Sequence, residues 1–201
     1  MTCGMLLDLE WEALGRAVRT RDLEGAVHVE DRVVIAVRML PVLQGDAMGS
    51  TLREVLAAQG WEAQPDGTMT RRFGAVTATL DAGATSVTVS READATVTAT
   101  GTSAAIKGDA ADEARADAVA RERAEQALED KRAKAAERLE AENAAALTRE
   151  EPGVRAALQE ALNRVYRRAL EERARQLGEV ESIDERGDVR GGYEVTVVVK
   201  A

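Results

Sequence analysis

Apolar residues recur with two periods along the chain, and the shorter period predicts strands. Residues 26–30 and 32–40 are rich in Val and Ile, which predicts two strands that meet around Glu30-Asp31 and end before Pro41. Residues 74–101 alternate small apolar residues with Thr and Ser, so they predict an antiparallel meander with a hydroxyl-rich open face. Its turns are expected at Asp81-Ala82-Gly83 and at Arg91-Glu92-Ala93-Asp94.

The end of the chain has the same β-rich character. Residues 179–185 and 193–200 predict a C-terminal hairpin, joined through the turn residues of RGDVRGG. The tripeptide Arg186-Gly187-Asp188 also occurs in cell-adhesion motifs, but Gly and Asp between two strands are ordinary turn residues. We therefore interpret it as a turn.

The longer period predicts helices near the N-terminus. Residues 5–19 carry one apolar stripe, formed by Leu7, Trp11, Leu14 and Val18, with a short strand at MLLDL as the alternative. Residues 49–60 predict a second helix, which Ser50 or Thr51 can cap and Gly60 ends. Trp61 follows directly and is expected to anchor the core.

A long segment without Gly or Pro runs from Asp109 to Thr148. Asp109 can cap its start, and Ala, Glu, Lys and Arg all have high helix propensity. A break is expected at Pro152-Gly153, after which residues 154–177 carry a broad apolar stripe and end at Gly178. The final helix is therefore expected to pack on the sheet.

The middle helix has little to bury. Its large aliphatic residues are Val119, Leu128, Leu139 and Leu147, whose spacing fits no heptad, and alanines fill the gaps. Roughly 40 residues at about 1.5 Å each span about 60 Å, whereas a compact domain of this size is only about 30–35 Å across. The helix is therefore predicted to project as an arm. A solvated single helix is the favoured form, an alanine-seamed hairpin or coiled coil the second, and disorder the third; the four large residues are the candidate partner contacts.

Charge and composition exclude several classes of function. The net charge of −9 argues against binding a phosphate backbone, and five aromatic residues give little support to base stacking. Cys3 is the sole cysteine, so no internal disulfide can form. No secretory signal and no membrane span is evident, and a cytoplasmic location is expected.

Candidate chemistry is sparse. His28 is the single histidine, so an ordinary zinc site or a histidine-assisted nucleophile is not expected. The chain contains neither GxxxxGK[ST] nor GxGxxG, hence no phosphate-binding loop is signalled. We predict no catalytic, cofactor-binding or metal-binding residues, and no cofactor. A carboxylate-dependent enzyme remains the alternative, because paired acids cannot be recognised from sequence.

Two segments resemble a known family. LREVLAAQGWE and LNRVYRRALEERARQLG, the second with Asn163 and Tyr166, are similar to a small family of cyanobacterial and chloroplast reading frames of unknown function. The resemblance covers residues 33–101 and 154–201. Related domains are accessory components of bacterial FtsH ternary systems, which encode a MoxR-type AAA+ ATPase, a von Willebrand A protein and an FtsH-like ATPase or protease together. The resemblance thus implies protein partners, plausible ones being the AAA+ ATPase and the von Willebrand A protein.

These observations lead to one architecture and one leading function. We expect an α+β fold, ferredoxin-like or related, in which an antiparallel sheet with packed helices carries a long inserted Ala/Glu/Arg-rich helical arm. Residues 1–104 would form the body, 105–153 the arm, and 154–201 a helix and a hairpin that complete the body. The expected function is a non-enzymatic adaptor, without nucleic acid. A self-assembling structural protein, with the arm mediating homo-oligomers, is a further alternative.

Overall fold

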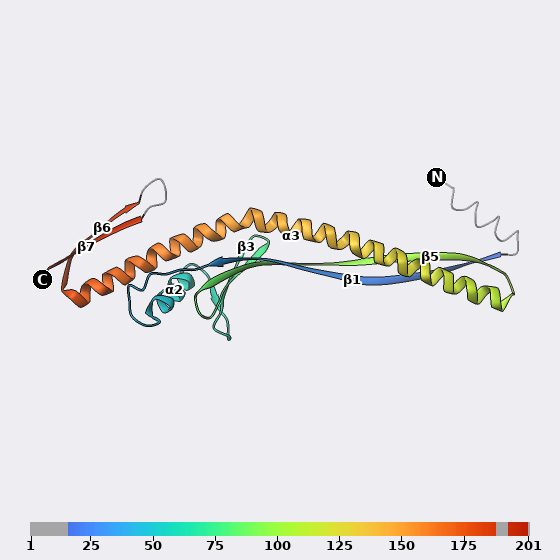
Figure 1. Ribbon diagram of the computed structural model, residues 1–201, viewed down its shortest axis with the longest axis horizontal. Coiled ribbons are helices and arrows are strands. Elements are labelled where there is room, and N and C mark those ends of the chain that lie inside the picture. The colour runs from blue at the N-terminus through green and yellow to red at the C-terminus, as the bar shows by residue number, and fades with distance from the viewer. Residues whose placement is uncertain (1–15, 188–192, 201) are drawn as a thin grey trace. The chain divides into compact units, whose positions relative to one another are not determined.

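The structure is a computed structural model in which residues 16–187 and 193–200 are described. Its class is α+β, as predicted, with two helices and seven strands among the described residues (Figure 1). The elements, in chain order, are β1 (Arg16–Ala36), α2 (Ala47–Ala58), β2 (Glu62–Ala63), β3 (Met69–Phe73), β4 (Val76–Leu80), β5 (Ser86–Ile106), α3 (Ala110–Leu177), β6 (Glu179–Gly187) and β7 (Tyr193–Lys200).

Five strands form one antiparallel sheet in the order β1-β5-β4-β3-β2. The expected break of β1 at Glu30-Asp31 is wrong, and so is the expected turn at residues 91–94, because β1 and β5 each run unbroken for 21 residues. The alternation explains part of this continuity. Odd-numbered residues of β5 point inward, so Glu92 and Asp94 fall on the open face and do not interrupt the pleat.

The described chain divides into two compact units. Residues 1–30 and 92–143 form the first, which we call the ribbon unit, and residues 31–91 and 144–201 form the second, the sheet unit. The first 15 residues lie outside the described part, and with them most of the helix expected over residues 5–19. Val18, the last residue of its stripe, lies in β1.

The sheet unit contains the larger apolar core. Leu52 and Leu56 of α2, Leu80 of β4, Val87 of β5 and Val154 of α3 are all essentially inaccessible to solvent. Burying one such side chain stabilises the fold by roughly 1.5–3 kcal/mol. The opposite face of the sheet carries the hydroxyl-rich positions that the alternation predicted.

Trp61 anchors this core, as expected. It is only 3% exposed, and its ring meets that of Phe73 edge to face, with centroids 6.1 Å apart. The chain reaches it through Gly60, whose φ of +86° ends α2 in a conformation that glycine adopts without strain. The start of α2 differs from the prediction, since the helix begins at Ala47 after Asp46 and neither Ser50 nor Thr51 caps it.

The helix α3 contradicts the expected boundary at Pro152. It is one helix of 68 residues with Pro152 inside it. Its apolar stripe explains the continuity, because Leu147, Val154, Leu158 and Val165 are all buried in the core of the sheet unit. Packing of that stripe outweighs the missing N–H of an exposed proline. The predicted end of the arm at residue 153 therefore lies inside a continuous helix, whereas its predicted start at residue 105 lies next to the end of β5 at Ile106.

The start of α3 agrees with the prediction. The Oδ1 atom of Asp109 accepts hydrogen bonds from the N–H groups of Ala111, at 2.9 Å, and Asp112, at 3.1 Å. The acids Asp112 and Glu113 stand in the first turn, where the helix dipole favours negative charge.

The C-terminal hairpin forms as predicted but does not close the main sheet. β6 and β7 pair with each other in a sheet of two strands, with an irregularity between Val180 and Ser182. In a ferredoxin-like fold the second helix would return the chain to the first sheet. Here α3 leads into a separate hairpin, and in the five-stranded sheet β2 to β5 form a meander with β1 beside β5.

Candidate interaction surfaces

The ribbon unit is a two-stranded ribbon with a helix along one face. Figure 1 shows the first half of α3 running beside β1 and β5. The inner side of this helix is a seam of small residues, broken by two leucines and one asparagine. The buried members are Ala116, Ala120, Ala124, Leu128, Ala135, Leu139 and Asn143. The middle helix is thus a single helix, as favoured, but its alanines pack on its own strands.

The contact along this seam is unusually close at Gly101. A Cβ atom added there would lie 1.9 Å from the carbonyl oxygen of Ala120 and 2.5 Å from the amide nitrogen of Ala124. Both obstacles are main-chain atoms of the helix. The ribbon therefore meets the helix backbone directly, which explains why alanine fills the seam and why the segment needs few large side chains.

The four candidate partner contacts fall into two groups. Leu128, Leu139 and Leu147 are 7%, 5% and 5% exposed and pack within the chain, whereas Val119 is 37% exposed. A role of the three leucines in partner binding stays a prediction. The side chain that the structure leaves most accessible among the four is Val119.

Ion pairs and hydrogen bonds fix the helix on the ribbon. Arg19 pairs with Glu113 and Arg21 with Asp117, both across the ribbon–helix contact. The hydrogen bond from Arg21 lowers the pKa of the Asp117 carboxyl and raises that of the arginine. Farther along, Asn143 is fully buried, and its Nδ2 atom donates to the carbonyl oxygen of Val29 at 3.3 Å.

The helix also covers one open edge of the ribbon. β4 pairs with β5 only as far as Ser90. Beyond it, Lys131 donates from Nζ to the carbonyl oxygen of Thr98 at 2.6 Å, and Arg123 donates from Nη1 to that of Thr102 at 2.7 Å. Cationic side chains on an edge strand discourage pairing with another chain. The β5 edge is therefore protected along part of its length.

Three exposed apolar side chains gather near one end of the ribbon unit. β1 begins, β5 ends and α3 begins at this end (Figure 1). Val18 is 46% exposed, Ile106 56% and Val119 37%. We call these three residues the end patch. A hydrogen bond links the end of β5 to the start of α3 at this point, since Asp112 accepts from the N–H of Ile106 at 2.7 Å.

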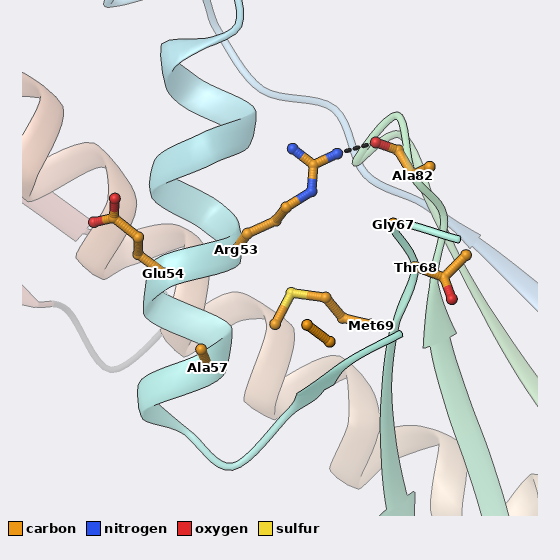
Figure 2. Close-up of a pocket in the computed structure, with 8 residues that line it drawn as sticks. Arg53, Glu54, Ala57, Gly67, Thr68, Met69 and Ala82 are labelled. Atoms are coloured by element: carbon orange, nitrogen blue, oxygen red, sulfur yellow. Dashed lines mark hydrogen bonds between the residues drawn. The ribbon is translucent and has the colours of Figure 1, made fainter. Parts of the chain in front are cut away.

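A pocket of about 410 Å³ lies in the sheet unit, between α2 and the strands β2 and β3 (Figure 2). Ala57, Ala63 and Met69 provide much of its apolar lining, and Arg53 crosses it to donate to the carbonyl oxygen of Ala82. Glu54 is the one carboxylate in the lining. A single acid beside an arginine that is already bonded does not form a general acid–base pair.

The residues that the structure describes contain no group of three or more His, Cys, Asp or Glu side chains that could hold a metal ion. No described helix is long and apolar enough to cross a lipid bilayer. The sole histidine, His28, lies on the open face of β1, where its Nδ1 atom is 2.8 Å from Asp94.

Comparison with known families gives a match that covers nearly the whole chain. The pattern of the family described as FtsH ternary system domain X5 matches residues 14–201. The chain belongs to this family. The family match confirms the resemblance found in the two short segments, and it extends over both units and over the whole of α3. No curated protein and no solved structure matches the chain.

Proposed function

We propose that this component of an FtsH ternary system is a non-enzymatic adaptor that docks a protein partner through the end patch of its ribbon unit. Membership of the family supports protein partners. The AAA+ ATPase and the von Willebrand A protein of the same system are the partners we expect, because a ternary system implies proteins that act together. A cytoplasmic location belongs to this proposal, since a single cysteine leaves no internal disulfide to form.

The observation that carries the proposal is the position of the end patch. Of the seven large apolar side chains exposed in the described part of the chain, Val18, Ile106 and Val119 lie near one end of the ribbon unit. Val18 and Ile106 stand on the open face of the ribbon, whereas Val119 stands on the helix that covers the other face. A partner surface that encloses the end therefore fits better than a flat one.

The experiment is a binding assay with the purified ATPase and von Willebrand A proteins of the same system. Ile106→Glu and Val119→Glu each place a charge in the end patch, and the double variant is expected to weaken binding at least about tenfold, or about 1.4 kcal/mol. Both sites are exposed, so the fold should change by no more than about 0.5 kcal/mol. Ala141→Glu, at an exposed position farther along the same helix, is the matched control.

The outcome depends on the difference between these variants. Equal binding by the double variant and the wild type would remove the end patch from the proposal. If Ala141→Glu weakened binding to the same extent, the effect would come from negative charge added to the helix and not from the end patch. Removal of residues 109–148 is a poorer test, because Ala146 and Leu147 belong to the core of the sheet unit and their loss would damage it.

A further inference from the structure

The outer edge of β1 is a second place where another chain can pair. β1 stands at the end of the strand order, so one side of it has no neighbouring strand in the described sheet. The N–H of Val37 donates to the carbonyl oxygen of Thr85, at 2.7 Å, next to the start of β5. Main-chain groups alternate in direction along a strand, so those of Arg32, Val34 and Ala36 face the open side.

A groove follows this edge. It has a volume of about 440 Å³ and is lined by residues 35–37, at and just after the end of β1, and by α3. The α3 side carries the apolar Leu158 and Leu162 together with the polar Arg155 and Gln159. Every second side chain of a strand added to β1 would enter it. On the other face of the same edge, Val34 is 60% exposed, and Leu40 beyond the strand is 72% exposed. The edge thus offers main-chain partners, a groove and uncovered apolar area together.

The chain itself contains a segment with the matching pattern. In the β6–β7 hairpin, Val180 pairs with Val199 and Ile183 with Val197. Directly paired residues share a face, so positions 180, 183, 197 and 199 fall on one face of the hairpin by register, and the sequence has a β-branched apolar amino acid at each. A hairpin of two strands is at best marginally stable in water and needs a third strand or a covering element.

The distribution of charge indicates which strand of the hairpin would pair with the open edge of β1. Residues 32–44, on and after the β1 edge, contain Arg32 and Arg38 and no acid. β6 contains four acids and one basic residue, Arg186, whereas β7 has one acid and one lysine. Acidic β6 therefore complements the β1 edge, while β7 does not. By register, Asp184, which pairs with Thr196, falls on the opposite face of the hairpin from position 183. If the face of position 183 enters the groove, Asp184 lies on the same side of the extended sheet as the open face of β1.

We propose that β6 of a second copy of this chain adds to the open edge of β1, with its apolar face in the groove between β1 and α3. The contact extends the five-stranded sheet by a hairpin from the other copy. It uses the edge that the helix cations leave uncovered, whereas the β5 edge is capped by Lys131 and Arg123. This pairing is independent of the end patch.

The test measures self-association of the full chain by multi-angle light scattering and sedimentation across a broad range of concentration. Wild type should reach a mass of two or more chains. Val34→Pro removes one outward N–H without removing a bond to β5, and edge strands tolerate proline. It should weaken association at least about tenfold. Val34→Thr, which keeps the N–H, should associate as the wild type does.

Charge reversal gives a second measurement that does not depend on proline. Arg38→Glu and Asp184→Lys should each weaken association, and the two substitutions combined in one chain should restore it. A wild type that stays monomeric overturns the proposal, and so does an association unaffected by Val34→Pro and by both reversals. A monomer whose β6 amides exchange slowly, and exchange faster in Val34→Pro, would show that the hairpin pairs within its own chain, which also overturns it.

Discussion

The close contact at Gly101 leads to the sharpest prediction about stability. In Gly101→Ala the new methyl group meets the carbonyl oxygen of Ala120 at 1.9 Å and the amide nitrogen of Ala124 at 2.5 Å. Neither atom can rotate away, because both belong to the helix backbone. The helix must withdraw by about 1 Å or more before the contact approaches the usual 3.5 Å, and the contacts of the buried alanines loosen with it.

The expected magnitude follows from two opposing effects. Overpacking of a close contact costs about 1–3 kcal/mol, whereas loss of glycine freedom in the unfolded chain contributes about 0.4–1 kcal/mol in the opposite direction. With both effects near the middle of their ranges, the net loss is about 1–2 kcal/mol, which corresponds to a Tm lower by about 2–8 °C for a chain of this size. Thermal unfolding followed by circular dichroism measures it, and hydrogen exchange at residues 116–124 shows whether the helix contact has loosened.

Gly25→Ala is the matched control, in the opposite strand of the same ribbon. Its new Cβ would lie 2.3 Å from the Nε and Nη2 atoms of Arg132, the far end of a flexible side chain that can swing into solvent. We expect a Tm equal to that of the wild type or slightly higher. Adding Ala120→Gly to Gly101→Ala should give no rescue, because the obstacle is a carbonyl oxygen. Equal Tm values for Gly101→Ala and Gly25→Ala would refute the reasoning.

Three further predictions concern single groups. The hydrogen bond to Asp94 raises the pKa of His28, the one histidine, so its NMR titration midpoint should lie above 6.5 and should fall in Asp94→Asn. The raised pKa stabilises the fold below pH 6.5, and this contribution is lost as the pH rises through the pKa of the folded state. Burial raises the pKa of Asp81, but hydrogen bonds from Thr85 and Ser86 outweigh burial, so the net shift of the pKa is downward. The ionised Asp81 therefore stabilises the fold above pH 3.8, and this contribution is lost as the pH falls through the pKa of the folded state. Asp81→Ala should cost about 1–2 kcal/mol in urea unfolding at pH 7, with a smaller loss at pH 3; the same loss at both would contradict the assignment. Pro152→Ala should raise the free energy of unfolding by about 1–3 kcal/mol, because it restores an N–H inside a continuous helix; no gain would mean that the helix is interrupted there.

The class of the fold was accessible from sequence because the strands alternate strictly. The meander, the turn at Asp81, the end of α2 at Gly60 and the C-terminal hairpin all follow from local turn chemistry and the two-residue period. These signals are properties of a few neighbouring residues. They do not depend on which other segment the strand meets.

The sequence predictions that are wrong depend on distant packing. Charged residues at 30–31 and 91–94 were expected to end strands, but Glu30, Glu92 and Asp94 fall on the open face, where a charge leaves the pleat intact. Pro152 was expected to end a helix, yet the buried stripe on either side holds the helix together. Helix propensity describes neighbouring residues only, so it cannot show that burial of this stripe outweighs the effect of one proline.

The surfaces were the least predictable part. Spacing alone could not show that Leu128 and Leu139 face the ribbon, because the seam consists mostly of alanine and has no heptad. One signal was available in hindsight, namely Gly101 at an inward position of a strand. A glycine at such a position often marks the close approach of another backbone. The exposure of Val18 and Ile106 depends on the end of the ribbon and has no local signature.

The alanine seam also limits how this protein can change over generations. At Gly101 the ribbon has no room even for a methyl group, since the helix backbone already fills the space, whereas the exposed side of the helix can exchange charged residues freely. Homologues should therefore have low sequence identity and still share the spacing of small side chains along the contact between helix and ribbon. Recognising them will depend on scoring residue volume at those positions, more than on matching the amino acids themselves.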